Sequence, residues 1–152
     1  MPTTFEKLNL KGQNPIVILN APESFEPELR TLRGVKVVRA LSDADAVEFS
    51  LAFVTTLKEV EAAAKALAKK AKGDATIWFA YPKGSSKKYK CEFNRDTGWQ
   101  ALGNAGFEPV RMIAIDEDWT ASRFRRVEFI EKMTRAKEHR FTAQGKARAT
   151  KT

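Results

Sequence analysis

The residues best suited to chemistry in this chain lie in three short, separate segments. The first is the sequence NAPE at residues 20–23, the second is a lysine-rich loop at residues 83–90, and the third is an acidic run at residues 116–118 followed by Trp119. Lysines attract anions, aromatic rings stack on flat ligands, and carboxylates bind cations or accept protons. These segments favour the binding of an anionic ligand.

The lysine-rich loop, KGSSKKYK, is the strongest of the three candidates. Glycine and serine allow an adaptable backbone, the ammonium groups of Lys83, Lys87 and Lys88 would supply positive charge, and Tyr89 could stack on a base. The functional interpretation is a clamp for phosphate or nucleic acid. The competing interpretation is a solvated loop that only improves solubility, as surface lysine runs commonly do.

The acidic run allows two interpretations as well. Asp116 could bind a ligand, with Trp119 as a flat surface and Arg123 as a further positive charge. Alternatively, Asp116 or Asp118 hydrogen-bonds the backbone of its own turn or pairs with Arg123, and Trp119 belongs to the core.

Several kinds of reaction centre are excluded by what the sequence lacks. His139 is the only histidine and Cys91 the only cysteine, so neither a histidine-centred triad nor a cysteine-based metal site can be assembled. Without a base partner, Cys91 is expected to be an inert thiol. The sequence therefore predicts no catalytic residue and no metal site.

The turn after the first expected strand also argues against a cofactor. Sites for dinucleotides or S-adenosylmethionine need glycines there, so that the backbone can approach the ligand. Residues 20–25 read NAPESF, without glycine, and Glu23 would repel a pyrophosphate. No P-loop motif occurs either. We expect no cofactor, and Asn20 is retained only as a polar contact to the ligand.

The net charge of +8 is unevenly distributed along the 152 residues. Residues 82–95 carry +4 and residues 123–152 carry +7, which leaves −3 for the remainder. This asymmetry favours an anionic partner, either a phosphate-bearing small molecule or nucleic acid. No apolar run approaches the ~20 residues of a membrane span, and no signal-peptide pattern is visible, so a cytoplasmic protein without membrane association is expected.

Alternating strand and helix patterns predict an α/β fold. Strands are expected at residues 15–20, 35–39, 47–54, 75–81, 109–115 and 122–129, the last of them antiparallel. Helices are expected after Ser24, from a capping box at residues 56–59, and from Asp96. The pattern is typical of a three-layer Rossmann-like sandwich with a mostly parallel sheet of five to six strands and a C-terminal antiparallel hairpin. Residues 1–134 would form a single domain, and residues 135–152 a basic, disordered tail.

Three motifs occur together in this chain: NAPE at residues 20–23, WFAYPK at residues 78–83, and DEDW at residues 116–119 with Arg123 and Phe124 after it. In this combination, residues 8–127 resemble a family of small bacterial proteins known only as a domain of unknown function. The resemblance implies a Rossmann-like domain akin to a reduced methyltransferase without the glycine-rich cofactor turn. It implies no activity, cofactor or catalytic residue.

The sequence thus leads to one main hypothesis and two alternatives. The main hypothesis is a non-catalytic module, or the remnant of an enzyme, that binds an anionic ligand at the carboxyl edge of the sheet. The first alternative is a divergent S-adenosylmethionine-dependent methyltransferase. The second is a nucleic-acid-binding protein that uses the basic loop and tail.

Overall fold

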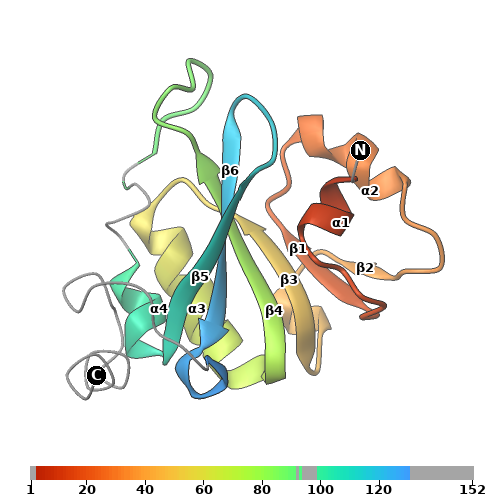
Figure 1. The fold of residues 1–152 in the computed structure, drawn as a ribbon, viewed down its shortest axis with the longest axis vertical. Helices are drawn as coiled ribbons and strands as arrows, with labels where there is room; N and C mark the ends of the chain where they lie inside the picture. Colours follow the sequence, from red (N-terminus) through yellow and green to blue (C-terminus); the bar gives the residue numbers. More distant parts are fainter. Residues whose placement is uncertain (1–2, 92, 94–98, 131–152) are drawn as a thin grey trace.

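The computed structural model describes residues 3–91, 93 and 99–130 of the chain, and its centre is a six-stranded sheet of order β2-β1-β3-β4-β6-β5 (Figure 1). The strands are β1 (Ile16–Leu19), β2 (Val37–Val38), β3 (Val47–Phe53), β4 (Ala71–Pro82), β5 (Phe107–Ala114) and β6 (Trp119–Arg126). Strands β1 to β4 pair in parallel, and β6 pairs antiparallel with both β4 and β5. The expected α/β fold with a C-terminal antiparallel pair is confirmed.

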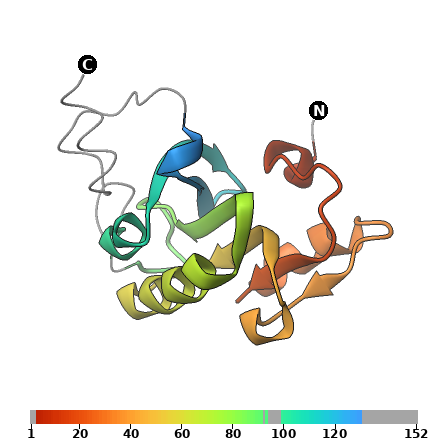
Figure 2. The ribbon, with the colours of Figure 1, turned by 90° about the horizontal axis from the view of Figure 1, so that it is seen from below.

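Helices cover both faces of the sheet and complete three layers (Figure 2). On one face lie α3 (Leu57–Lys70) and α4 (Gln100–Asn104), and on the other lie α1 (Thr4–Lys7) and α2 (Glu26–Arg30). Three 3-10 turns, η1 (Glu23–Phe25), η2 (Leu41–Asp43) and η3 (Val127–Phe129), lie in the connections.

The inner strands bury side chains on both faces, which is why their sequences are almost continuously apolar. In β4, Phe79 and Tyr81 pack on the side of α3 and α4, whereas Trp78 and Ala80 pack on the side of α1 and α2. All four side chains are at least 97% buried. The Trp78 Nε1 donates a 2.7 Å hydrogen bond to the Leu8 carbonyl and so fixes the N-terminal segment to the sheet.

The capping box at the start of α3 is confirmed. The Thr56 hydroxyl accepts a hydrogen bond from the Glu59 amide at 3.2 Å, and the Glu59 Oε1 accepts one from the Thr56 amide at 3.1 Å. This arrangement satisfies backbone donors that a helix N-terminus otherwise leaves open.

Some expected boundaries are wrong. Ser24 does not cap a helix, because the chain first forms η1, whose N-cap is Pro22 and has no side-chain cap. The final strand begins at Trp119 rather than at residue 122, since the turn before it is only a few residues long. The α1 helix was not predicted. The cap expected at Asp96 and the tail expected at residues 135–152 lie outside the described residues.

No helix within the described part of the chain is long and apolar enough to cross a membrane.

Candidate ligand pocket

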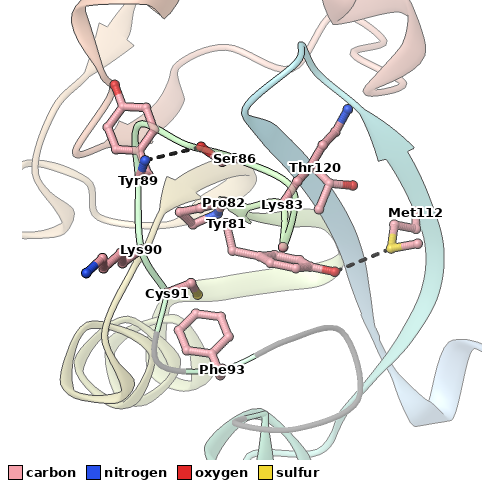
Figure 3. Close-up of a pocket in the computed structure, with 11 residues that line it drawn as sticks. Tyr81, Pro82, Lys83, Ser86, Tyr89, Lys90, Cys91, Phe93, Met112 and Thr120 are labelled. Atoms are coloured by element: carbon pink, nitrogen blue, oxygen red, sulfur yellow. Dashed lines mark hydrogen bonds between the residues drawn. The ribbon is translucent and has the colours of Figure 1, made fainter.

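A pocket of about 610 Å³ lies at the carboxyl end of β4, under the loop that leaves this strand (Figure 3). The loop after β4 and the β5–β6 hairpin project from the same end of the sheet (Figure 1). The pocket is lined by Tyr81, Pro82, Lys83, Gly84, Ser86, Tyr89, Lys90, Cys91, Phe93, Met112 and Thr120. These residues come from the end of β4, the lysine-rich loop, the residues that directly follow this loop, and the two hairpin strands.

Hydrogen bonds to Ser86 shape the loop above the pocket. The Ser86 hydroxyl donates to the Asp118 Oδ1 at 2.9 Å and accepts from the backbone amides of Tyr89 at 3.1 Å and Lys88 at 3.3 Å. The Lys83 amide donates to the Asp118 carbonyl at 2.8 Å. The loop is therefore folded on itself and tied to the hairpin, although its composition alone suggests an adaptable segment.

Aromatic side chains form the apolar part of the pocket. The Tyr81 and Phe93 ring centroids are 5.9 Å apart, and Trp99 lies behind both, at 5.3 Å from Tyr81 and 4.8 Å from Phe93. The Tyr81 hydroxyl donates a 3.3 Å hydrogen bond to the Met112 Sδ across the pocket (Figure 3). A thioether is a weak acceptor, so a stronger acceptor on a ligand would compete well for this hydroxyl.

Two lysines supply positive charge beside the aromatic rings. Lys83 is half-buried, and its amine points towards the tip of the β5–β6 hairpin; the amine of Lys90 points outward from the pocket (Figure 3). A lysine ammonium sits on a flexible four-carbon stem, so both groups would have to turn towards the pocket mouth to meet an anion there. The arrangement combines an apolar floor with cationic rims, and this suits a ligand with a flat body and an anionic group.

The predicted loop residues separate into two groups. Lys83 and Tyr89 line the pocket, whereas Lys87 and Lys88 are exposed and lie outside its lining. The Lys88 ammonium is 5.5 Å from the Tyr89 ring centroid, a cation–π contact on the outer side of the loop.

The predicted residues of the acidic run have structural roles. The Asp116 Oδ1 accepts hydrogen bonds from the amides of Asp118 and Trp119, both at 2.8 Å, and so closes the turn between β5 and β6. Trp119 is 4% exposed, and its ring lies between those of Phe53 at 5.1 Å and Tyr89 at 4.9 Å. These contacts agree with the alternative interpretations made from the sequence, in which Asp116 hydrogen-bonds the backbone of its own turn and Trp119 belongs to the core.

Arg123 does not line the pocket, because it lies opposite Trp78, whose side chain is on the other face of the sheet from that of Tyr81. Burial lowers the pKa of the Arg123 guanidinium, and the nearby charges of Arg125 and Arg111 add to this effect, against the opposing influence of Asp74.

Asn20 occupies a different part of the same sheet edge. It lies between the ends of β1 and β3, where the strand order changes direction and where α/β sheets commonly bind ligands. Its amide donates to the Phe53 carbonyl at 3.3 Å and to the Glu59 Oε2 at 3.5 Å. Because Glu59 already accepts hydrogen bonds from the amides of Thr55 and Thr56, just before α3, the protein's own carboxylate lies beside the helix start, where a phosphate could otherwise bind.

Sequence reasoning missed the apolar half of the pocket. Tyr81 is the last residue of the strand expected at residues 75–81, but no sequence pattern pointed to Phe93, Met112 or Thr120 as ligand-binding residues. Met112 and Thr120 reach the pocket because β6 inserts beside β4 and pairs Thr120 with Tyr81.

Within the described residues, no group of three or more histidine, cysteine or acidic side chains could hold a metal ion.

The sequence matches no family model and no curated protein sequence. Among solved structures, the N-methyltransferase NodS from Bradyrhizobium japonicum WM9 aligns with a TM-score of 0.44 and 14% sequence identity, over 74% of this chain and 73% of that one. At this level of similarity no residue role is transferred. The resemblance to an uncharacterised bacterial family stays a prediction from the sequence.

Proposed function

We propose that the protein binds an anionic, phosphate-bearing small molecule with a flat body in the pocket at the end of β4. The observation that carries this proposal is the composition of the pocket, in which Tyr81 and Phe93 form an apolar floor beside the lysine-bearing loop. The rings would hold the body of the ligand, and Lys83 and Lys90 would neutralise its phosphate. Tyr89 and Ser86 would form the wall on the loop side.

Backbone NMR titration of the full chain tests this proposal, with ATP, adenosine and S-adenosylhomocysteine added separately. The proposal expects saturable shifts at residues 81–91 and 112–120 with ATP, and much weaker binding of adenosine, which has no phosphate. No saturable shifts in these segments with ATP would overturn it. Saturable binding of S-adenosylhomocysteine without ATP binding would overturn it in favour of the methyltransferase alternative.

Two matched double variants locate the positive charge that matters. Lys83→Gln with Lys90→Gln removes two charges from the pocket lining, and Lys87→Gln with Lys88→Gln removes two from the exposed part of the same loop. We expect the first pair to weaken ATP binding about a hundredfold or more, since each of the two lost charge-assisted contacts contributes about 1.5–3 kcal/mol and each 1.4 kcal/mol is a factor of about ten. The second pair should change it much less. Equal losses in both would argue for general electrostatic attraction and against the pocket.

A further inference from the structure

Met112 lies at the border between the pocket and solvent. It is 46% exposed, and it also lines the pocket at the end of β4. It comes from β5, an edge strand of the described sheet, where Val110, two residues earlier, is 41% exposed. An oxidant dissolved in water can therefore reach this side chain without an opening of the core.

The sulfur of this methionine is bonded to the floor of the pocket. The Tyr81 hydroxyl donates the 3.3 Å hydrogen bond to the Met112 Sδ that Figure 3 shows. Tyr81 is only 3% exposed, and its ring is held by those of Phe93 and Trp99, whose centroids lie 5.9 Å and 5.3 Å away. By contrast, a methionine side chain is unbranched and has three rotatable bonds. Of the two partners, Met112 is the one that can readily change its position.

The thioether of methionine is a side-chain group that hydroperoxides oxidise. The sulfur attacks the terminal oxygen of the peroxide, and the O–O bond breaks as the S–O bond forms. The proton on the transferred oxygen passes to the leaving oxygen, which departs as water or an alcohol. The sulfur loses two electrons and the peroxide gains them. Methionine sulfoxide reductases return the sulfoxide to methionine, so the change is reversible.

Oxidation of Met112 would strengthen the acceptor that faces Tyr81. A thioether sulfur is a weak acceptor, whereas the oxygen of a sulfoxide is strongly polar. The flexible side chain can bring this oxygen to the tyrosine hydroxyl. Because a hydroxyl has a single proton to donate, a proton bound to the sulfoxide is no longer available to a ligand.

We propose that Met112 is a reversible oxidation site for hydroperoxides, and that its oxidation weakens ligand binding in the pocket. In the reduced protein, a ligand competes with a weak acceptor for the Tyr81 hydroxyl. In the oxidised protein, it competes with a strong one. The effect on the ligand rests on the proposed function, whereas the change at Tyr81 does not. The pocket thus holds its ligand under reducing conditions and releases it under oxidising ones.

The test compares the full chain before and after treatment with millimolar hydrogen peroxide. Peptide mass spectrometry shows whether Met112 has gained an oxygen atom. Tyr81 and Tyr89 are the only tyrosines, so isotope labelling of tyrosine gives NMR signals from two rings, which Tyr81→Phe assigns. The affinity for ATP is measured in parallel.

Two methionine variants make the test specific. Met112→Leu keeps an apolar side chain of similar volume but has no sulfur. Met133→Leu is the matched control, at a methionine that lies outside the described residues. Met112→Leu also keeps Cys91, whose thiol lines the pocket and could itself react with peroxide.

We expect peroxide to oxidise Met112 and to shift the ring signals of Tyr81 much more than those of Tyr89. ATP binding should weaken about fivefold, which corresponds to about 1 kcal/mol, the net contribution of one hydrogen bond. Methionine sulfoxide reductase should reverse both changes. Met133→Leu should respond like the wild type. Met112→Leu and Tyr81→Phe should lose no affinity on treatment, because one lacks the sulfur and the other the hydroxyl.

The proposal is overturned if peroxide leaves Met112 unoxidised, or if the oxidised chain keeps the Tyr81 signals and the ATP affinity of the untreated chain. It is also overturned if Met112→Leu loses as much affinity as the wild type, since oxidation of Cys91 would then be the cause. If ATP does not bind the untreated chain, the proposed function is wrong, and the Tyr81 signals alone decide whether oxidation of Met112 acts on the pocket.

Discussion

The Ser86 hydroxyl donates a hydrogen bond to the Asp118 carboxylate at 2.9 Å, and this contact joins the lysine-rich loop to the turn between β5 and β6. Ser86 also accepts hydrogen bonds from the amides of Lys88 and Tyr89, so a single side chain orders both the loop and its attachment. The pocket lies between the two segments that this contact joins. Its shape therefore depends on a residue that is neither aromatic nor charged.

Replacement of Ser86 by alanine should loosen the loop and weaken ligand binding. The variant loses one hydrogen bond to a charged group, worth about 1.5–3 kcal/mol at most, and two weaker bonds within the loop. Hydrogen exchange followed by NMR should show faster exchange of the amides at residues 83–91, with little change in the strands. Ser85→Ala is the matched control, because Ser85 is exposed in the same loop. Equal exchange rates in both variants would contradict a specific role for Ser86.

The two tryptophans that pack on the α1 side of the sheet should respond differently to replacement by phenylalanine. Trp78 donates to the Leu8 carbonyl at 2.7 Å, whereas the buried Trp119 Nε1 has no acceptor among the described residues. Both changes shrink a buried ring, but only Trp78→Phe also leaves a carbonyl without its donor. We expect Trp78→Phe to lower the free energy of unfolding by about 1–3 kcal/mol more than Trp119→Phe. Urea denaturation of both variants measures this difference, and a larger loss in Trp119→Phe would refute the explanation.

The ion pair between Glu26 and Arg39 should make stability depend on acidic pH. Hydrogen bonds from Arg39, at 2.9 Å and 3.0 Å, lower the pKa of the Glu26 carboxyl below its ordinary value of 4.5. The folded state thus binds this proton less readily than the unfolded state, so the contribution is complete above pH 4.5 and disappears as pH falls through the lower, folded-state pKa. The effect is small because the pair lies at the surface.

An NMR titration of the Glu26 side chain checks this prediction directly. In Arg39→Gln the Glu26 pKa should rise towards its ordinary value of 4.5, and the difference in stability between this variant and the wild type should shrink as the pH falls below that value. An unchanged Glu26 pKa in the variant would show that Arg39 is not the cause.

Asn20 should tolerate glycine better than alanine. Its φ of +57° lies in the left-handed region, which disfavours a residue with a Cβ and which asparagine enters more readily than most. Both substitutions remove the side-chain amide, so their difference isolates the backbone. Asn20→Ala should be less stable than Asn20→Gly by about 1 kcal/mol, measured by thermal or chemical unfolding. Equal stability would mean that the turn relaxes to another conformation.

The inner part of the fold could be predicted from sequence because its signals are local. Continuous apolar runs indicated β1, β3 and β4, and the spacing of Thr56 and Glu59 indicated the start of α3. By contrast, α1 has only four residues, too few for a periodic pattern, and depends on the burial of Phe5 against the sheet. Its formation is a tertiary effect.

The candidate site was less predictable than the fold, for a similar reason. The lysine loop is contiguous, so Lys83 and Tyr89 could be identified from sequence, but neighbouring lysines differ in whether they face the pocket. Met112 comes from a strand that does not contact β4 directly, and it reaches Tyr81 only because of the strand order. The residue that pairs with Arg123 on the neighbouring strand could not be predicted either, since no local sequence pattern indicates that Arg111 lies opposite it.

The position of β6 between β4 and β5 has a consequence for the order in which the sheet can be completed on the ribosome. Strand β5 is synthesised before β6, yet in the folded sheet β5 does not pair with β4, because β6 lies between the two strands. Until the nascent chain has been synthesised to about Arg126, the edge of β4 that later pairs with β6 keeps its backbone donors and acceptors unpaired. Exposed strand edges of this kind readily pair with other chains. The time needed to synthesise residues 83–126 therefore sets how long this edge stays open, and β6, the last strand among the described residues, closes it.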